Sequence, residues 1–290
     1  MSKIDKFYGA KNLFQCPKCK KKIRFHAGGL VCKKEHTFDI AAKGYVNLLQ
    51  QTKSFKGYDA DFFQSRRRFF SAGYYDHIVE NVVETVDKFL GSREGLVVLD
   101  AGCGEGGYSA ALSQYLAAKD REAQILAFDI AADAIKVAAG NDDVKWMIAD
   151  ITNIPVKDGV VDCILDVFTP ANYKEFNRVL KDDGYLIKVV PGSNHLKELR
   201  AAVSEQLQNK EYSNEEVTDY FEGHYEPISR VKLTKTMEIG GQNLEDLIRM
   251  TPLLFDVDKT KLDVSGVKEI TIEGEVLVGR KLTYIDKKTK

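Results

Sequence analysis

The chain has 290 residues, of which 44% are hydrophobic and 29% are charged, and its formal net charge is −1. This composition excludes a disordered chain, and the absence of any apolar run of about 20 residues excludes a bilayer-spanning helix. We therefore predict a globular, cytoplasmic protein with one large and one small domain and no membrane partner, and the first 15 residues lack the apolar core of a secretory signal.

The first quarter of the chain is strongly basic. Residues 1–72 contain 16 lysines and arginines against 5 acidic residues, a balance of +11, and the remaining residues have a balance of −12. A basic segment joined to an acidic domain is typical of a protein that binds a polyanion such as nucleic acid. A solvated, lysine-rich surface is the alternative interpretation.

Residues 1–49 contain two pairs of potential metal ligands. Cys16 and Cys19 have the spacing C-x2-C, and after 12 further residues Cys32 and His36 have the spacing C-x3-H. Three thiolates and one imidazole suit a tetrahedral Zn²⁺ without an open coordination position, and therefore a structural site. A disulfide or redox pair between Cys16 and Cys19 is the alternative, which a cytosolic location disfavours. We predict that residues 1–49 form a zinc-binding module that recognises RNA.

A linker and a helix follow this module. The polar stretch Gln50–Asp61 is predicted as a linker, and residues 50–74 are assigned to the linker and the start of the helical region. From Tyr75 to Leu90, apolar residues recur at intervals of three and four, which is the pattern of an amphipathic helix. Residues 75–290 are predicted as the second, larger domain.

The larger domain alternates predicted strands and helices. Such a repeat predicts an α/β fold with a parallel, doubly wound sheet whose ligands bind at the carboxyl ends of its strands. Two later β-rich runs are predicted to add a reversed hairpin at one edge. The predicted strands are Leu96–Asp100, Gln124–Asp129, Val144–Ala149, Asp162–Val167 and Tyr185–Val190, the helices are Gly107–Ala118, Ala131–Ala139, Ala171–Leu180 and Asn243–Met250, and the β-rich runs are Arg230–Ile239 and Val267–Ile285.

The first strand of this domain ends at an acidic residue and runs into a glycine-rich turn, formed by Asp100, Gly102, Gly104, Gly106 and Gly107. Glycine allows a tight turn from strand to helix and lets a ligand approach bare backbone. The glycine spacing also fits the fingerprint of proteins that bind NAD or FAD. Asp100 favours S-adenosylmethionine instead, because a carboxylate repels a pyrophosphate but suits the ammonium and sulfonium charges of this methyl donor.

Acidic residues also end the next two strands. Asp129 follows the glycine-rich turn at the distance where a carboxylate binds both ribose hydroxyls in this architecture. Asp150 is placed to accept a hydrogen bond from the adenine amino group, with Ile151 against the ring. The alternative for both carboxylates is to act as the N-cap of a helix at a strand-to-helix turn.

The fourth strand ends near two candidate catalytic residues, Asp166 and Phe168. The loop after this strand faces the transferable methyl group in this architecture, so Phe168 is predicted to stack on a flat base and Asp166 to take a proton. The alternative for Phe168 is packing in the core, and the alternative for Asp166 is an orientation into the sheet.

The order of these motifs resembles that of a known family, the large-subunit ribosomal RNA guanine-N1 methyltransferases. They place a zinc module ahead of a class I methyltransferase domain, and the resemblance extends over nearly the whole chain. The segment that leaves the zinc module is its most specific feature. The residues that carry the resemblance are Cys16-Pro-x-Cys19, Cys32, His36, Phe38-Asp39, Gly44-Tyr45-Val46-Asn47-Leu48-Leu49, Arg66-Arg67-x-Phe69, Ala72-Gly73-Tyr74-Tyr75, Leu99-Asp100 to Gly106, Pro191-Gly192, His195-Leu196 and Met250-Thr251-Pro252.

This resemblance implies a class I, Rossmann-like methyltransferase fold. It also implies that a methyl group passes from S-adenosylmethionine to N1 of a loop guanine in large-subunit ribosomal RNA. By the same resemblance, Tyr75 and His195 approach the methyl donor beside Glu105 and Gly106, and two copies of the chain form a homodimer that shapes an RNA cleft.

Three successive arginines, Arg66, Arg67 and Arg68, are predicted to bind phosphates of the RNA. They cannot all lie on one face of a helix, so we expect two of them to reach the RNA. Two other functions fit parts of the sequence: a small-molecule methyltransferase whose zinc module contacts proteins, and an RNA-binding protein whose methyltransferase fold no longer catalyses. The basic first quarter disfavours the former, and the intact glycine-rich turn with Asp100 and Asp129 disfavours the latter.

Overall fold

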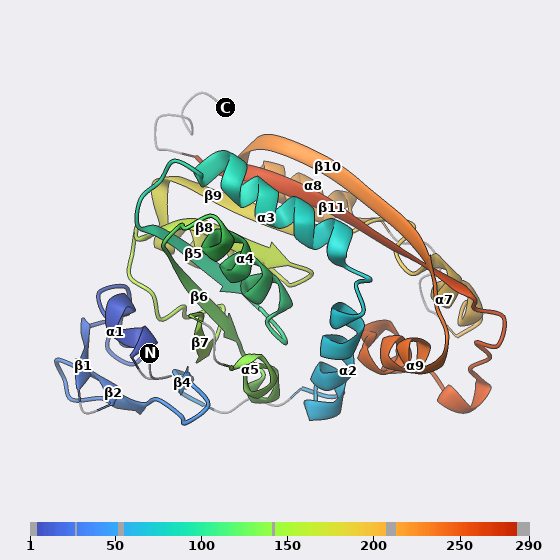
Figure 1. Ribbon diagram of the computed structural model, residues 1–290, viewed down its shortest axis with the longest axis horizontal. Coiled ribbons are helices and arrows are strands. Elements are labelled where there is room, and N and C mark those ends of the chain that lie inside the picture. The colour runs from blue at the N-terminus through green and yellow to red at the C-terminus, as the bar shows by residue number, and fades with distance from the viewer. Residues whose placement is uncertain (1–4, 27, 52–54, 141–142, 207–212, 283–290) are drawn as a thin grey trace.

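The computed structural model describes residues 5–26, 28–51, 55–140, 143–206 and 213–282. A small antiparallel sheet lies in the N-terminal region (Figure 1). Its strands, in spatial order, are β1 (Ile23–His26), β2 (Gly29–Cys32) and β3 (Thr37–Asp39).

An eight-stranded sheet organises the rest of the molecule (Figure 1). In spatial order its strands are β10 (Tyr225–Glu238), β11 (Glu269–Lys281), β9 (Leu180–Pro191), β8 (Val161–Val167), β5 (Leu96–Ala101), β6 (Ala123–Asp129), β7 (Lys145–Ile148) and β4 (Tyr45–Asn47). The strands from β9 to β4 pair in parallel, and β11 pairs antiparallel with both β9 and β10. The predicted mostly parallel sheet with a reversed edge is confirmed, and residues 283–285 of the last predicted run lie outside the described residues.

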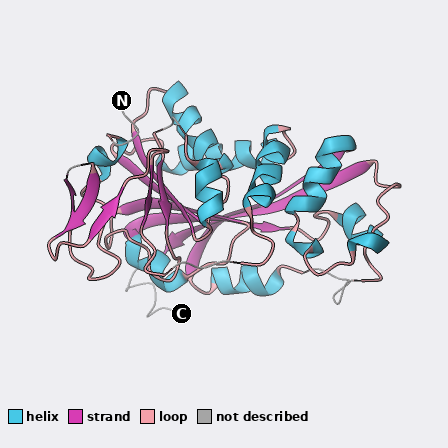
Figure 2. Cartoon of the chain, turned by 90° about the horizontal axis from the view of Figure 1, so that it is seen from below, coloured by secondary structure: helices cyan, strands magenta, loops and turns pink. Residues whose placement is uncertain are grey.

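Helices lie on both sides of the strands, as Figure 2 shows. Within the described ranges, none of them is long and apolar enough to cross a membrane. The helices are α1 (Lys6–Ala10), α2 (Ala60–Ser71), α3 (Asp76–Leu90), α4 (Gly107–Ala118), α5 (Ala132–Ala138), α6 (Tyr173–Val179), α7 (Lys197–Ala202), α8 (Glu215–Glu222) and α9 (Gly241–Met250), with short 3₁₀ turns at Pro252–Leu254 and Lys259–Lys261. The predicted amphipathic helix after the linker is confirmed as α3.

The predicted end of the linker is wrong. The linker was expected to continue through Gln50–Asp61, but α2 already begins at Ala60. The reason is a local capping interaction, in which the Asp59 carboxylate accepts a hydrogen bond from the Phe62 N–H at 2.8 Å. Residues 52–54 of the predicted linker lie outside the described residues.

The two faces of the large sheet pack against different neighbours. In β5, Val98 belongs to one core cluster and Leu99 to the other, because successive side chains of a strand point to opposite faces. The cluster around Val98 includes residues of α3 and α4 such as Val82. The cluster around Leu99 includes Phe14 and Leu30 from the N-terminal region. This region therefore covers part of one face of the large sheet, beside α6 and α8, and shares its core.

Backbone hydrogen bonds also join the N-terminal region to the large sheet. The strand β4, which falls within the predicted module of residues 1–49, pairs with β7 at the edge of the large sheet. The Gln15 N–H donates to the Pro155 carbonyl at 3.1 Å, and the Lys157 N–H donates to the Leu13 carbonyl at 2.9 Å. The loop after β7 is thus attached to the N-terminal region at Pro155 and Lys157.

Candidate functional site

A cavity of about 310 Å³ opens at the carboxyl ends of β5, β6 and β8. Ligands bind at this end of the strands in open α/β sheets. The walls come from the glycine-rich turn, the end of β6, the loop after β8 and aromatic residues of and near α2. The lining residues are Phe55, Tyr58, Phe62, Phe63, Arg66, Gly102, Gly104, Asp129, Ile130, Ala131, Val167, Phe168, Thr169, Pro170 and Pro252. We call this space the cofactor cavity.

The glycine-rich turn forms one wall of the cofactor cavity. Gly102, Gly104 and Gly106 have φ angles of 72°, 55° and 84°, in the left-handed region that favours glycine. A Cβ atom at Gly102 would collide with the Thr169 hydroxyl, and one at Gly106 would collide with the Trp146 ring. Both the backbone conformation and the close packing therefore require glycine in this turn.

Asp100 lies beneath the turn and is only 2% exposed. Its carboxylate accepts a hydrogen bond from the Ser109 hydroxyl at 2.6 Å, in the first turn of α4. Burial raises the pKa of Asp100 to about 7, and the nearby Glu105 and Asp129 carboxylates add to this effect. Asp100 is not among the described residues that line the cofactor cavity, and its contact with the cofactor's ammonium group stays a prediction.

Asp129 lines the cofactor cavity at the end of β6. One of its oxygens accepts from the Gly104 N–H at 3.0 Å, and the other accepts from the Ala131 N–H at 2.8 Å. Burial raises the pKa of Asp129, and these backbone donors oppose that shift. Asp129 thus ties the glycine-rich turn to the start of α5, and its contact with the ribose stays a prediction.

Asp150 and Ile151, also predicted to contact the cofactor, are not among the described residues that line the cavity. One Asp150 oxygen accepts from both the backbone N–H and the hydroxyl of Thr152, at 2.8 and 2.7 Å. This is an Asx turn, whereas the alternative interpretation is a helix N-cap, and among the described residues no helix begins at Asp150. Ile151 packs with the core cluster that the N-terminal region shares. Their contacts with adenine stay a prediction.

Arg66 lies at the cofactor cavity, although the sequence predicts an RNA phosphate as its partner. Its Nε atom is 2.5 Å from the Glu105 Oε2 atom, with side-chain exposures of 22% and 2%. Burial raises the pKa of Glu105, and the Arg66 charge opposes that rise. The pair places a half-buried cation beside the glycine-rich turn, within the cavity wall.

The other two arginines also have partners within the chain. The Arg67 guanidinium donates to the Val137 carbonyl, and its side chain is exposed. Arg68 forms two hydrogen bonds with the Asp246 carboxylate, at 2.9 and 2.5 Å, which join α2 to α9. Both residues lie outside the cofactor cavity, and their binding to RNA stays a prediction.

An aromatic row follows the loop after β8. The ring centroids of Tyr75 and Phe168 are 6.0 Å apart, and those of Phe168 and His195 are 5.7 Å apart. Phe168 has a φ angle of 54°, an uncommon conformation for a residue with a side chain, which is typical of functional sites. Burial lowers the pKa of His195 to about 4, so its ring is neutral and Nδ1 accepts from the Glu273 N–H at 3.2 Å. Three residues predicted for the site thus meet here.

Asp166 is fully buried beneath the same loop. Its Oδ2 atom lies 2.7 Å from the Lys188 Nζ atom, which also donates to the Thr169 carbonyl at 3.2 Å. Burial raises the pKa of Asp166 to about 6, and Lys188 opposes that rise. Lys188 is not predicted as a site residue from the sequence, yet a lysine inside the apolar strand Tyr185–Val190 is a signal of a buried polar partner.

A second cavity, of about 650 Å³, adjoins the cofactor cavity. Phe168, Thr169 and Pro170 line both cavities, so the loop after β8 is their shared wall. The remaining lining residues come from α6, β9 and α8 and the loops beside them: Ala171, Tyr173, Lys188, Val189, Val190, Pro191, Glu216, Val217 and Tyr220. We call this space the second cavity.

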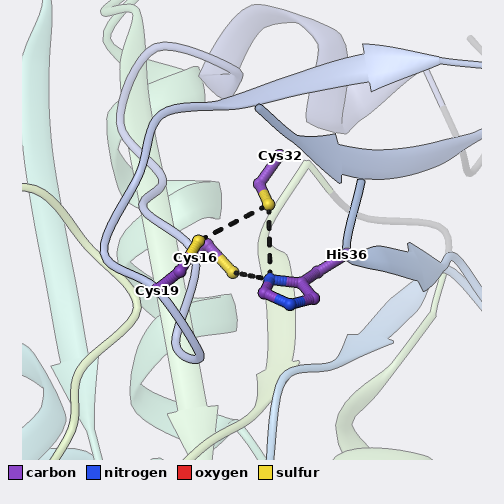
Figure 3. Close-up of side chains that lie close together, drawn as sticks. All are labelled: Cys16, Cys19, Cys32 and His36. Carbon is purple, nitrogen blue, oxygen red and sulfur yellow. Dashed lines mark hydrogen bonds between the residues drawn. The ribbon is translucent and has the colours of Figure 1, made fainter. Parts of the chain in front are cut away.

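The four predicted zinc ligands converge in the N-terminal region (Figure 3). The Sγ atoms of Cys16 and Cys32 each lie 3.4 Å from the His36 Nδ1 atom, and the Sγ atoms of Cys19 and Cys32 are 3.6 Å apart. Ligands at about 2.0–2.3 Å from a tetrahedral Zn²⁺ are separated by about 3.3–3.8 Å. The four side chains therefore fit Zn²⁺, with His36 binding through Nδ1.

Two family models match the chain. The model described as "RlmA, N-terminal" matches residues 14–55, which include all four zinc ligands. The model described as "Methyltransferase domain" matches residues 92–245, from just before β5 into α9. The predicted zinc-binding module, which we call the zinc ribbon, and the predicted S-adenosylmethionine-dependent methyltransferase fold are confirmed.

Individual proteins match over most of the chain. YxjB of Bacillus subtilis (strain 168), named as a candidate 23S rRNA (guanine-N(1)-)-methyltransferase, is 35% identical over 93% of this chain and 98% of its own. The 23S rRNA (guanine(748)-N(1))-methyltransferase of Streptomyces fradiae is 27% identical over 92% of this chain and 96% of its own. One solved structure shares the fold, with a TM-score of 0.50. It is a chain from the complex between the Haloferax volcanii Trm112 methyltransferase activator and a methyltransferase, and it is 15% identical over 80% of this chain and 100% of its own. The chain therefore belongs to the family of 23S rRNA (guanine-N1)-methyltransferases.

Proposed function

We propose that this chain transfers the methyl group of S-adenosylmethionine to N1 of a loop guanine in 23S rRNA. The observation that carries the proposal is the meeting of two cavities at one loop, since Phe168, Thr169 and Pro170 line both. The cofactor cavity, walled by the glycine-rich turn, suits the methyl donor, and the second cavity has the volume for a nucleobase. Two relatives that align with more than nine-tenths of the chain are named for this reaction.

The reaction depends on alignment and on the exclusion of water more than on a strong catalytic group. S-adenosylmethionine, when bound, supplies a methyl group that the N1 electron pair takes as the thioether leaves, and the N1 proton passes to water. Phe168 lines both cavities and keeps water from the reacting atoms, and the rings of Tyr75 and His195 pack against it. Asp129 lines the cofactor cavity and suits the ribose, and Asp100, buried beneath the glycine-rich turn, suits the ammonium group.

The target guanine is unpaired or flipped out, because N1 is hidden inside a base pair of a duplex. The zinc ribbon supports this proposal with a set of exposed basic side chains that suit the phosphates around the target. These side chains are Lys18, Lys21, Lys22, Arg24, Lys33 and Lys34. Arg67, exposed on α2, adds a further cation.

The same proposal places the protein in the cytoplasm, where its ribosomal substrate is made. The homodimer that the resemblance implies stays a prediction. Light scattering of the purified protein, with and without an rRNA fragment, measures the number of copies.

Methyl transfer from labelled S-adenosylmethionine to unmethylated 23S rRNA tests the proposed function, with the modified base mapped on the RNA. We expect a single N1-methylguanosine in a loop. If protein that binds the cofactor and holds zinc transfers nothing to this RNA, the proposal is wrong, and small molecules or proteins become the candidate substrates. Salt provides a second criterion, because methylation of RNA weakens steeply as salt is added and turnover of a small molecule changes little.

A further inference from the structure

The second cavity has a buried ion pair in its wall. Lys188 is only 3% exposed, and Asp166, 2.7 Å away, is fully buried, yet Lys188 lines the cavity. The register of the sheet sets the two residues side by side, because Asp166 of β8 pairs with Lys188 of β9. Two buried charges lose their hydration, which offsets much of their attraction. An ion pair at the junction of two cavities therefore indicates a function other than stability.

This ion pair retains the capacity to bind a ligand. An ammonium group has three N–H donors. Among the described residues, the acceptors recorded for Lys188 are the Asp166 carboxylate and the Thr169 carbonyl. A ligand in the second cavity can therefore accept the third N–H of Lys188 without displacing either partner.

The other walls of the second cavity are aromatic and acidic. Tyr220 stacks on Tyr173, with ring centroids 5.2 Å apart and an angle of 19° between the rings, and Tyr220 is 59% exposed. Glu216, one turn earlier on α8, is exposed and lines the same cavity. The cavity thus offers a stacking surface, a cation for an acceptor on the ring and a carboxylate for a donor on the ring.

We propose that the second cavity is the guanine site, in which Lys188 binds O6 and Glu216 binds the amino group on C2. This inference rests on the proposed function and names the residues that read the base. Guanine carries an acceptor on C6 and a donor on C2, whereas adenine would direct an amino group toward the Lys188 ammonium. In guanine, N1 is bonded to the carbon that carries O6. Lys188 also donates to the Thr169 carbonyl, and Thr169 lines the cofactor cavity. A guanine whose O6 accepts from Lys188 therefore has N1 next to the cofactor cavity.

Lys188 also stabilises the charge that develops during the reaction. When N1 releases its proton to water, the negative charge of the ring spreads to O6, where the ammonium holds it. The N1 electron pair then forms the bond to the methyl carbon as the carbon–sulfur bond breaks, which leaves a neutral base and a neutral thioether. Asp166 acts as a positioning residue, because it is buried behind Lys188 and holds the ammonium in place.

The double variant Lys188→Met, Asp166→Asn tests this site without leaving a lone buried charge. Lys181→Met is the matched control, since Lys181 lies on the same strand but binds Asp162, which also retains Arg93 as a partner. With 23S rRNA at pH 7, we expect single-turnover methylation by the double variant to fall by about 10²-fold or more. Cofactor affinity, measured by calorimetry, stays unchanged in both variants.

The pH dependence of the rate separates this role from a structural one. The wild-type rate rises with pH as the N1 proton is lost. Without the Lys188 ammonium this rise moves to higher pH, so alkaline buffer restores part of the rate of the double variant. A loss of rate that is equal at every pH would contradict the proposal, because it would mean that the two residues only support the fold.

Glu216 is tested with RNA that carries inosine at the target position, since inosine lacks the amino group on C2. We expect the wild type to prefer guanosine, and we expect Glu216→Ala to lower that preference by about tenfold, the worth of one hydrogen bond to a charged group. Glu215→Ala, the neighbour that does not line the cavity among the residues described, keeps the preference.

The outcomes distinguish this inference from the proposed function. If the wild type methylates rRNA at guanine N1 and the double variant keeps the wild-type rate, Lys188 is not part of the base site and the inference is wrong. An unchanged preference in Glu216→Ala overturns the role of Glu216. If the wild type transfers no methyl group to rRNA, the proposed function itself fails.

Discussion

The zinc ribbon and the large sheet are stabilised in different ways. Central strands such as β5 and β8 are buried along their whole length, so apolar burial is the main contribution to the stability of the sheet. The ribbon has three short strands of its own, and its Phe14 and Leu30 side chains share a core cluster with Leu126 and Phe128 of the sheet. What the ribbon adds is four metal ligands. Its fold therefore depends on a metal at one end and on the sheet at the other.

The junction between these regions lies at the loop after β7. The Asn153 side chain donates to the Pro17 carbonyl at 3.2 Å, and the Gln50 side chain donates to the same carbonyl at 2.6 Å. Pro17 lies between the zinc ligands Cys16 and Cys19. Metal binding at the ribbon should therefore also order the loop after β7, which begins near Asp150, the residue predicted to contact adenine.

Loss of zinc is expected to have the largest effect. Replacement of Cys32 with Ser, or removal of the metal by a chelator, should unfold the ribbon, because small metal-binding modules fold only with their metal. Methylation of 23S rRNA should be abolished. Cofactor affinity should also fall, since the loop at Asn153 loses its contact with Pro17. Circular dichroism, metal content and calorimetric titration with S-adenosylmethionine measure these effects.

Restoring zinc provides the control for the chelator experiment. Methylation of 23S rRNA and cofactor affinity should both return when the metal is added back to the wild type. Neither should return in Cys32→Ser. If the metal-free protein binds the cofactor with unchanged affinity, the ribbon and the sheet are separable, contrary to the shared core described above.

The Arg66–Glu105 pair, in which only the carboxylate is fully buried, provides the second test, on the side of the sheet. Glu105→Gln leaves the Arg66 cation without its partner, and we expect a loss of about 3 kcal/mol in the free energy of unfolding, at the low end for buried pairs because Arg66 is 22% exposed. Arg66→Met with Glu105→Gln should recover part of this loss. Denaturant unfolding measures both. The exposed Lys136–Asp133 pair is the matched control, because Asp133→Asn should cost less than about 1 kcal/mol. Losses that simply add in the double variant would show that the pair does not act as a unit.

The features that the sequence predicts well are local. The zinc ligands follow from the spacing of Cys16, Cys19, Cys32 and His36, and α3 follows from the apolar pattern that begins at Tyr75. Each of these signals lies within a few tens of residues. The ligand set of the metal site and the apolar face of the helix are both determined by the residues that give the signal.

The features that the sequence does not predict depend on contacts between distant elements. Arg66 pairs with Glu105 only because α2 packs over the glycine-rich turn, and its position within three arginines suggests an RNA contact instead. Lys188 becomes a site residue only when the register of β8 and β9 sets it beside Asp166. The Asx turn at Asp150 is not predicted either, because a motif alone does not choose between a ligand, a helix cap and a turn.

Gly102→Ala is expected to have a smaller effect than the broken ion pair. The Ala side chain would adopt a left-handed conformation and collide with the Thr169 hydroxyl, at a cost of about 1–3 kcal/mol in the free energy of unfolding, with weaker cofactor binding. Gly159→Ala is the matched control, because Gly159 has a φ angle of 64° but open space around its Cβ position. The difference between the two variants measures the close packing at Gly102, and equal costs would show that only backbone strain matters.

The smallest expected effect is the pH dependence of cofactor binding through Asp100. Burial raises the pKa of Asp100 to about 7, so in the free protein this carboxyl holds a proton at lower pH. The positive charge of the cofactor favours the carboxylate, and binding therefore releases a proton. The affinity should rise with pH up to about pH 7, by at most about tenfold per pH unit. Calorimetry in buffers of different ionisation enthalpy measures both the affinity and the released proton.

The stability of the free protein checks the sign of this effect. A carboxyl whose pKa is raised by folding binds more protons in the folded state between about pH 4 and pH 7, so its contribution to stability decreases as the pH rises through that range. Bound cofactor should cancel this decrease. Asp100→Asn removes the titrating group, so both the release of a proton and the pH dependence of stability assigned to this position should disappear. A wild-type affinity that stays constant from pH 5 to pH 7 would mean that Asp100 does not face the positive charge of the cofactor.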